Sequence, residues 1–288
     1  MCQINNLKFF LKSIKETLPF DDENDFKQKI TGNKDFRIKV QKLVYLSKFF
    51  GWNNTYHFNF HERGPYSIEL TEDYKNLFEP YKSHPNAFNF KIGSFKEFVE
   101  NQNNEFLEAS STILYYISKT NIDSIDKKTM LEIISYLKPH IPKETVDDAW
   151  EKINENDLLN NTTMKTQKTF PTKEMTIDKI NGLISIFENF EKCSNRLLLL
   201  GSLDYFKLAL KKENLKSPQK NKLLNSVYDY AEFIENYYFE NYKINDNFVY
   251  CDLEEINSKF DKLQDYISDL KVLPKVYDED VDLTIFCE

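Results

Sequence analysis

The fold is decided by residues 35–70, DFRIKVQKLVYLSKFFGWNNTYHFNFHERGPYSIEL. Apolar residues at helical spacing predict a helix from Asp35, its expected N-cap, to Phe50, with Gly51 as its stop. The apolar side chains fall on two nearly opposite faces, so we expect this helix to be the buried core helix of its domain, with its basic residues at the flanks. A helix buried on two sides lacks the wide exposed polar face that reading a DNA groove requires.

A short strand is predicted next, because residues 55–62, TYHFNFHE, alternate between apolar and polar. Its apolar face consists of Tyr56, Phe58 and Phe60. A second strand is predicted over residues 88–92, carrying Phe88, Phe90 and Ile92, and the two would pair as a small sheet packed on the helices. His57 and His61 lie ~13 Å apart on such a strand, too far to share one zinc ion, so no metal site is predicted.

A tight turn is predicted at Gly64-Pro65, followed by a helix with Ser67 as its N-cap. The polar residues of that helix are mostly acidic: Glu69, Glu72, Asp73 and Glu79 accompany Lys75. If the domain were a winged helix, this helix would be the reading helix, but an anionic face repels phosphates. This is the strongest sequence argument against a simple DNA reader.

The composition favours long helices, because the 288 residues include only 6 Gly and 9 Pro, where average usage gives roughly 20 and 14. The net charge is −8, yet residues 1–60 carry 10 basic and 6 acidic side chains, and residues 223–288 carry 5 and 16. Such a chain is not a general polyanion binder. Four widely spaced cysteines, no signal-peptide pattern and no long apolar run predict a cytoplasmic protein without membrane contact.

Two domains are predicted: a helical domain with a small two-stranded sheet, winged-helix-like at most, over residues 1–153, and an α-helical bundle over residues 176–288. Residues 154–175 are polar and are predicted to be a linker or long loop. The expected helices of the first domain span residues 3–18, 35–50, 67–77, 95–120, 130–137 and 143–153. A further expected helix carries Phe26 and Ile30, with the acidic residues between positions 21 and 25 as its N-cap and first turn. In the bundle, Thr176, Ser194, Ser217 and Asp252 are the expected helix starts. The acidic and apolar tail after Asp278 is either a solvated end, which we favour, or a short docking peptide.

Residues 39–77 resemble a family of prokaryotic proteins, the YwgA-like proteins, which are distantly similar to Panacea/SocA-like antitoxin and proteolytic-adaptor domains. The residues that carry the resemblance are Lys42, Leu43, Tyr45, Leu46, Phe58, Phe60, Gly64, Pro65, Tyr66, Ser67 and Leu70. The segment from Leu137 through Lys138-Pro139 to Ala149 is also family-like. The resemblance covers roughly the first half of the chain. It implies a helical domain with a small sheet and a regulatory or interaction role, and it transfers no catalytic residues.

Enzyme chemistry finds little support, because the sequence has no GxSxG elbow, Gly-rich phosphate loop, HExxH motif or Cys–His signature. No catalytic residue and no cofactor is predicted. An unrecognised nuclease-type enzyme, with the pair Asp147–Asp148 as metal ligands, stays as a second alternative.

The leading hypothesis is a non-enzymatic protein-interaction module, antitoxin-like or a defence-associated adaptor, which binds a protein partner and self-associates through the C-terminal helices. The expected partner contacts are His61, Glu62, Arg63, Tyr66 and Glu69, a mixed-charge set around the Gly64-Pro65 turn. The first alternative is a DNA-binding transcriptional regulator. Its expected phosphate contacts are Arg37, Lys39, Lys42 and Lys48, or the group Lys207, Lys211, Lys212, Lys216, Lys220 and Lys222.

Overall fold

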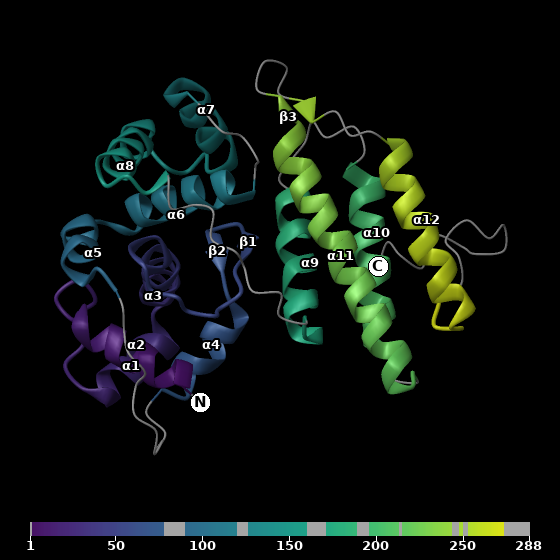
Figure 1. The fold of residues 1–288 in the computed structure, drawn as a ribbon, viewed down its shortest axis with the longest axis horizontal. Coiled ribbons are helices and arrows are strands. Elements are labelled where there is room, and N and C mark those ends of the chain that lie inside the picture. Colours follow the sequence, from purple (N-terminus) through teal and green to yellow (C-terminus); the bar gives the residue numbers. More distant parts are fainter. Residues whose placement is uncertain are drawn as a thin grey trace. The chain divides into compact units, whose positions relative to one another are not determined.

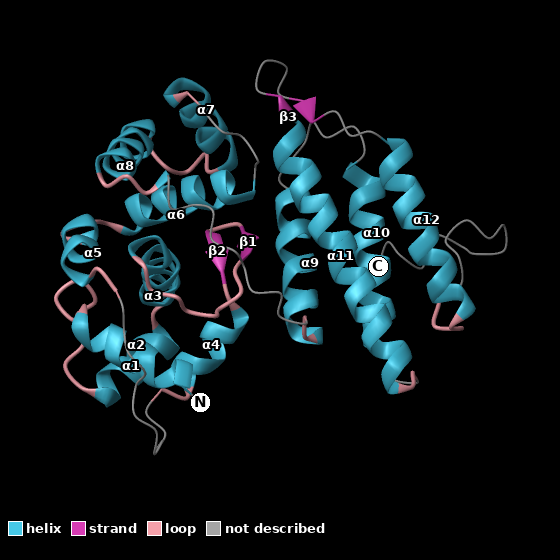
Figure 2. Ribbon diagram, in the orientation of Figure 1, coloured by secondary structure: helices cyan, strands magenta, loops and turns pink. Residues whose placement is uncertain are grey.

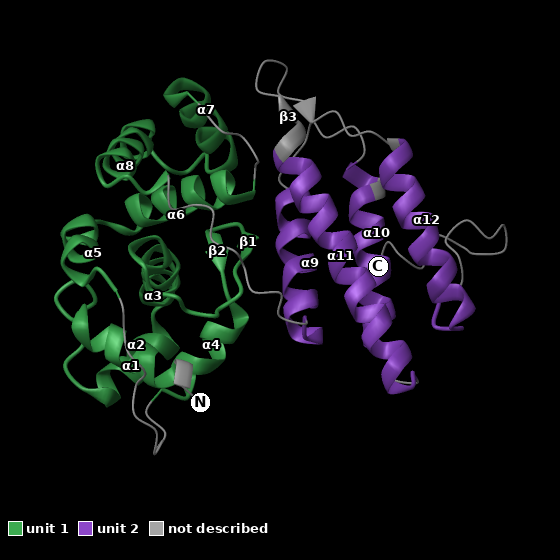
Figure 3. Cartoon of the chain, in the orientation of Figure 1, with its two compact units in different colours: residues 1–167 green, residues 168–288 purple. Residues whose placement is uncertain are grey.

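In the computed structural model the chain divides into two compact units, residues 1–167 and 168–288 (Figure 3). The structure describes residues 2–77, 90–119, 126–159, 171–188, 196–212, 215–243, 248–249 and 253–273. These residues are mostly helical, with two short pairs of antiparallel strands (Figure 2). The mainly α fold with a small two-stranded sheet is thus confirmed. The division between the units falls within residues 154–175.

Unit 1 contains eight α-helices, one 3-10 helix and one hairpin among its described residues. They are α1 (Cys2–Ser13), α2 (Glu23–Gly32), α3 (Lys34–Ser47), η1 (Lys48–Phe50), β1 (Asn59–His61), β2 (Gly64–Tyr66), α4 (Ile68–Lys75), α5 (Ile92–Val99), α6 (Asn104–Lys119), α7 (Lys127–Leu137) and α8 (Lys143–Glu155).

The centre of unit 1 is α3, which Figure 1 shows end-on, with α6 on one side and α2 on another. All of residues 40–47 are buried, as the two apolar faces predicted. The N-cap lies two residues earlier than predicted, because the side chain of Asn33, and not Asp35, accepts the hydrogen bond from the Phe36 N–H at 3.0 Å. Its extension η1 ends at Gly51, whose φ of 94° lies in the left-handed region that glycine favours.

The prediction for the sheet partner was wrong. β1 pairs with β2, which immediately follows it, while Ile92 begins α5 and Phe88 lies outside the described residues. Gly64-Pro65 is likewise strand and not turn, since the two turn residues are Glu62 and Arg63. Proline is tolerated here because β2 is an edge strand of a two-stranded sheet, where a missing N–H leaves no ladder bond unmade.

Two predicted helices are shorter in the structure. The helix expected over residues 95–120 is two helices, α5 and α6, separated at Asn101, whose φ is 58°, and at Asn103, which caps the Phe106 N–H at 2.8 Å. Asparagine tolerates positive φ and caps helices well, so two asparagines outweighed the apolar periodicity. The first helix ends at Ser13 and not at residue 18, although Leu18 is still fully buried.

Unit 2 consists of helices that lie alongside one another in Figure 1, together with a second strand pair that the sequence did not predict. The described elements are α9 (Lys173–Glu188), α10 (Arg196–Lys211), α11 (Ser217–Asn241), β3 (Tyr242–Lys243), β4 (Phe248–Val249) and α12 (Leu253–Asp269). Helix α9 begins before the predicted Thr176, because the Thr172 hydroxyl accepts a hydrogen bond from the Met175 N–H at 3.2 Å. The predicted starts Ser194 and Asp252, and the tail after Asp278, lie outside the described residues.

A buried ion pair joins α9 to α11 in the interior of unit 2. Lys179 Nζ lies 2.7 Å from Glu235 Oε2, and both side chains are 1% exposed. Lys179 Nζ also lies 5.5 Å from the centre of the Tyr228 ring. Because a buried charge needs its partner close by, this pair favours one alignment of α9 with α11.

We therefore expect Glu235→Ala to destabilise unit 2 by about 3–5 kcal/mol, because it leaves the Lys179 ammonium buried without its counter-charge. Hydrogen exchange of the α9 and α11 amides measures the loss. The double substitution Lys179→Met with Glu235→Leu removes both charges and should restore most of the stability. If the double variant were no more stable than Glu235→Ala, the ion pair would not be the cause.

Candidate functional site

The hairpin β1–β2 is the most strongly specified backbone of unit 1. Asn59 lies opposite Tyr66, and His61 lies opposite Gly64, across the two-residue turn. Gly64 has a φ of 81°, and a Cβ atom there would lie 2.9 Å from Thr112 Oγ1 and 3.2 Å from Lys42 Nζ. Only glycine fits this position, because any other side chain would meet both an unfavourable backbone conformation and these two atoms.

Two buried ammonium groups, those of Lys138 and Lys42, bind backbone carbonyls of the hairpin. Lys138 Nζ donates to the His61 carbonyl at 3.0 Å and to the Glu62 carbonyl, and it lies 4.6 Å from the centre of the Phe60 ring. Lys42 Nζ donates to the Pro65 carbonyl at 2.7 Å. Lys138 is 1% exposed and Lys42 is 2% exposed. The carbonyls on both sides of the turn are thus bound by charges that have no contact with bulk water.

Glu108, on α6, supplies the buried negative charge of this cluster. Its Oε1 lies 3.8 Å from Lys138 Nζ and 3.1 Å from His140 Nε2, and its Oε2 lies 4.0 Å from an Arg63 guanidinium nitrogen. Burial lowers the pKa of Lys138 to about 8 and the pKa of Lys42 well below its usual value, while Glu108 opposes both shifts. The carboxylate therefore helps to keep these lysines charged inside the protein.

The exit from the hairpin is fixed by the amide of Gln41. Its Nε2 donates to the Ser67 carbonyl at 2.9 Å, and its Oε1 accepts from the Ser67 N–H at 2.9 Å. Ser67 is also the N-cap of α4, as predicted, because its Oγ accepts from the Leu70 N–H at 3.2 Å. Gln41 therefore pairs with Ser67 as a neighbouring strand would, and connects α3 to the start of α4.

A third lysine, Lys48, fixes the segment that enters the hairpin. Its Nζ donates to the Tyr56 carbonyl at 2.6 Å and lies 4.9 Å from the centre of the Phe58 ring. Burial lowers the pKa of Lys48 to about 8, and the negative charge of Glu69 limits this decrease. Glu69 Oε2 accepts from the His57 N–H at 2.7 Å, and burial raises the pKa of Glu69.

The structure brings four of the five predicted partner contacts together at the hairpin. Glu62 and Arg63 form the turn, with side chains 60% and 42% exposed. The partly buried rings of His61 and Tyr66 pack edge-on, with centres 5.1 Å apart. Glu69 belongs to α4 and binds the backbone of its own chain, so its carboxylate faces the protein rather than a partner. We call His61, Glu62, Arg63 and Tyr66 the hairpin surface.

The two alternative groups of residues predicted to contact nucleic acid belong to different units. Lys42 and Lys48 are engaged with carbonyls as described, and Arg37 donates to the Ile30 and Thr31 carbonyls at the end of α2, both at 2.9 Å. Lys39 is half-buried, and burial lowers its pKa. Lys211 and Lys212 are exposed and belong to unit 2, at the end of α10.

Sequence reasoning did not assign a role to Glu108 or Gln41, it interpreted His140 only as a surface turn residue, and it used Lys138 only as part of the resemblance. A signal was present for Glu108, as it was for Lys42. Each of these two residues interrupts the most apolar face of a helix that is otherwise buried, where a charge needs a partner. The contacts themselves could not be found, because the residues that meet here are distant in the chain: Lys138 and His61, for example, are 77 positions apart.

Comparison with protein-family models, with curated proteins and with solved structures finds no match to this chain. Within the described ranges, no helix combines the length and the apolar character needed to cross a membrane. Across those same residues, no three His, Cys, Asp or Glu side chains are grouped so that they would hold a metal ion. Asp147, a ligand in the nuclease alternative, forms an ion pair with Lys127.

We expect Gly64→Ala to destabilise unit 1 by about 2 kcal/mol, because it places a Cβ atom at positive φ and against Thr112 and Lys42. Urea unfolding followed by tryptophan fluorescence measures the change, since both tryptophans, at positions 52 and 150, belong to unit 1. Gly93→Ala is the control: nothing lies within 4 Å of its Cβ position, so it should be neutral or slightly stabilising. Equal effects of the two substitutions would contradict the assignment.

The same measurement against pH tests the buried lysines. Because burial lowers the pKa values of Lys138 and Lys48 from 10.5 to about 8, the unfolded state binds more protons than the folded state between pH 8 and 10.5. The free energy of unfolding should therefore rise with pH in that window, by about 1 kcal/mol per pH unit for each lysine, and these groups contribute no slope below about pH 8. Above pH 10 Tyr116 opposes the rise, since burial raises its pKa to about 12.

Lys48→Met keeps the stem of the side chain and removes the titrating amine, so the slope of its curve between pH 8 and 10 should be lower than that of the wild type by about 1 kcal/mol per pH unit. Lys75→Met, on the exposed surface of α4, should leave the slope unchanged. A wild-type curve that is flat or falls over this range would show that the buried lysines are not desolvated in the folded protein.

Proposed function

We propose that unit 1 is a non-enzymatic protein-interaction module that binds a protein partner through the hairpin surface. The observation that carries this proposal is that the backbone of the turn is held inside the protein while its side chains are exposed. The backbone carbonyls of His61 and Glu62 are bound by the buried Lys138, and the side chains of Glu62 and Arg63 reach solvent. A turn that is fixed through its backbone presents its exposed side chains in one arrangement.

Such an arrangement favours binding because little conformational freedom is lost when a partner docks. The hairpin is fixed at its entry by Lys48, at its turn by Lys138, and at its exit by Lys42 and Gln41. An exposed acid beside an exposed base, flanked by two aromatic rings, suits a protein surface with complementary charges.

The antitoxin-like or adaptor role is the more specific part of the proposal, and it rests on the resemblance of residues 39–77 to the YwgA-like proteins. The residues that carry the resemblance include Gly64, Pro65 and Ser67, and these are the residues whose backbone the hairpin contacts hold in place. Lys42 also belongs to that set and binds the Pro65 carbonyl. The resemblance thus falls on the residues that shape the hairpin surface.

Binding to DNA is the weaker alternative. Lys42 and Lys48 are occupied in the interior, and the Arg37 guanidinium caps α2, which leaves few of the expected contacts exposed in unit 1. Phosphate binding needs several exposed cations that act together. The cations that remain for this alternative are the exposed lysines of unit 2: Lys211, Lys212, Lys216, Lys220 and Lys222. An enzyme centred on Lys138 is also weaker, since its ammonium is 1% exposed and is already bound to two carbonyls.

The test exchanges the exposed charges of the turn. The variant Glu62→Arg/Arg63→Glu keeps the net charge but reverses the pattern that a partner meets, so it should lose the partner in co-purification from the native host. Calorimetry on the recovered complex should show affinity reduced roughly tenfold or more. The purification is run with and without nuclease, so that a partner held only through nucleic acid is recognised.

The matched control is Glu72→Arg/Lys75→Glu on α4, an exposed pair 3.6 Å apart that is exchanged in the same way. It should retain the partner. If both variants kept the partner, the hairpin surface would not be the binding site. If nuclease removed every bound macromolecule and a DNA complex weakened steeply with salt, the DNA-binding alternative would replace this proposal.

A further inference from the structure

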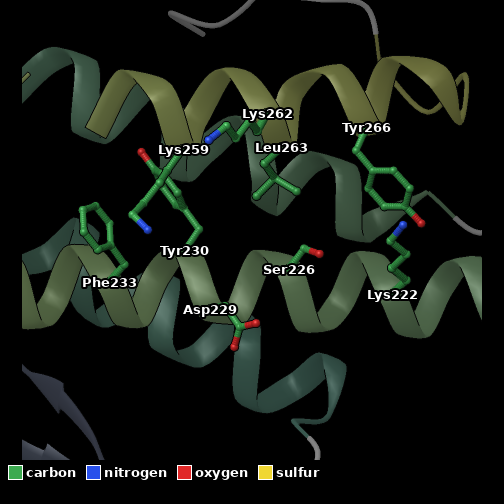
Figure 4. Close-up of a pocket in the computed structure, with 9 residues that line it drawn as sticks. All are labelled: Lys222, Ser226, Asp229, Tyr230, Phe233, Lys259, Lys262, Leu263 and Tyr266. Carbon is green, nitrogen blue, oxygen red and sulfur yellow. The ribbon is translucent and has the colours of Figure 1, made fainter. Parts of the chain in front are cut away.

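Unit 2 carries a basic groove between α11 and α12, with a volume of about 430 Å³ (Figure 4). At one end Lys222 Nζ lies 4.6 Å from the centre of the Tyr266 ring, and at the other end Lys259 Nζ lies 4.4 Å from the centre of the Phe233 ring. Lys262 lies between them along α12. Each end of the groove thus combines an ammonium group with an aromatic face.

The floor of the groove is apolar, because the buried side chains of Tyr230 and Leu263 lie between its two ends. One acidic residue, Asp229, also borders the groove, but Figure 4 shows its carboxylate pointing away from α12. Lys259 has an exposed ion pair with Glu255 at 3.8 Å, and Lys262 has no ion pair among the described residues. Three lysines against one aspartate make this a local positive surface.

That positive charge is unusual for its part of the chain. Residues 223–288 carry 16 acidic and 5 basic side chains, and two of those five bases line the groove. A groove with lysines on its rim and an apolar floor fits an acidic peptide that also carries apolar side chains. The chain contains such a segment: residues 278–286, DEDVDLTIF, have four acids followed by Leu283, Ile285 and Phe286.

A left-handed residue ends α12. The Val272 N–H bonds to the Ile267 carbonyl at 3.2 Å, the Lys271 N–H bonds to the Ser268 carbonyl at 2.8 Å, and Lys271 has a φ of 54°. This is the Schellman arrangement, in which a left-handed residue ends a helix and turns the chain away from the helix axis.

The length of the remaining chain suffices. From residue 273 to residue 278 an extended chain spans at most ~17 Å, whereas Tyr266 lies only seven residues back along the helix, ~10 Å. Lys259, at the far end, lies 14 residues back, ~21 Å, and an extended chain from residue 273 to residue 282 spans ~30 Å. The acids between residues 278 and 282 therefore have enough chain to reach all three lysines of the groove.

We propose that the groove between α11 and α12 is a docking site for the acidic segment 278–286 of the same chain. The acids of the segment lie on Lys222, Lys259 and Lys262, and its apolar residues cover the floor and the neighbouring aromatic faces. The segment thereby occupies a surface that an acidic segment of another protein would otherwise bind.

Hydrogen exchange of the full chain tests the proposal, because it reads the tail and the groove in one experiment. The amides of residues 278–286 should be protected in the wild type. The variant Lys259→Glu/Lys262→Glu should speed their exchange roughly tenfold, the combined effect of two exposed charge pairs. The amides of α11 and α12 in the same data show that the variant is folded.

The matched control is Lys211→Glu/Lys212→Glu, which makes the same charge change on exposed residues at the end of α10, outside the groove. It should leave the protection of the tail unchanged. A tail that exchanges as an unfolded peptide in the wild type would overturn the proposal. So would protection that the control removes equally, or protection that appears only at high protein concentration, which would assign the groove to the tail of a second copy.

Discussion

The hairpin of unit 1 depends on buried ammonium groups that bind backbone carbonyls. Removing a lysine from water is unfavourable by several kcal/mol, and it is offset here by the carbonyls of His61, Glu62 and Pro65 together with the Glu108 carboxylate. These compensating groups exist only when the turn has its native shape. The interaction therefore contributes more to the choice of one hairpin conformation than to stability. It also requires glycine at position 64, because Lys42 and Thr112 occupy the space that a larger side chain would need.

The two units use buried lysines differently. In unit 2, Lys179 pairs with a carboxylate on another helix, so the interaction aligns α9 with α11 and involves no loop. In unit 1, Lys42, Lys48 and Lys138 bind backbone carbonyls within residues 56–65. These interactions align the segment that contains the hairpin with the helices next to these lysines. A connection that served only to join two helices would not need two buried lysines and a third that is partly buried. Their concentration around one short hairpin is why we propose the hairpin surface as the binding site of unit 1.

The elements that the sequence predicted well are those determined by local chemistry. The core helix α3, its end at Gly51 and the cap at Ser67 follow from apolar periodicity, left-handed glycine and a side-chain hydrogen bond to a nearby N–H. The prediction failed where a distant contact decided the result. Gly64 and Pro65 have the composition of a turn, but they pair with His61 and Phe60 as a strand, and Lys42 binds the Pro65 carbonyl. The bonds from Lys138 to the hairpin join residues about 77 positions apart, and no periodicity or spacing reveals such a pairing.

The lowered pKa of Lys138 has the same origin as the rigidity of the hairpin. A lysine with a pKa of about 8 is often a sign of a catalytic amine, since it is partly neutral near neutral pH. An amine that acts on a substrate needs both a lone pair and access. Lys138 directs two of its three donors to carbonyls, has Glu108 3.8 Å away, and is 1% exposed. The lowered pKa of Lys138 is therefore the consequence of burying a cation that holds a backbone turn.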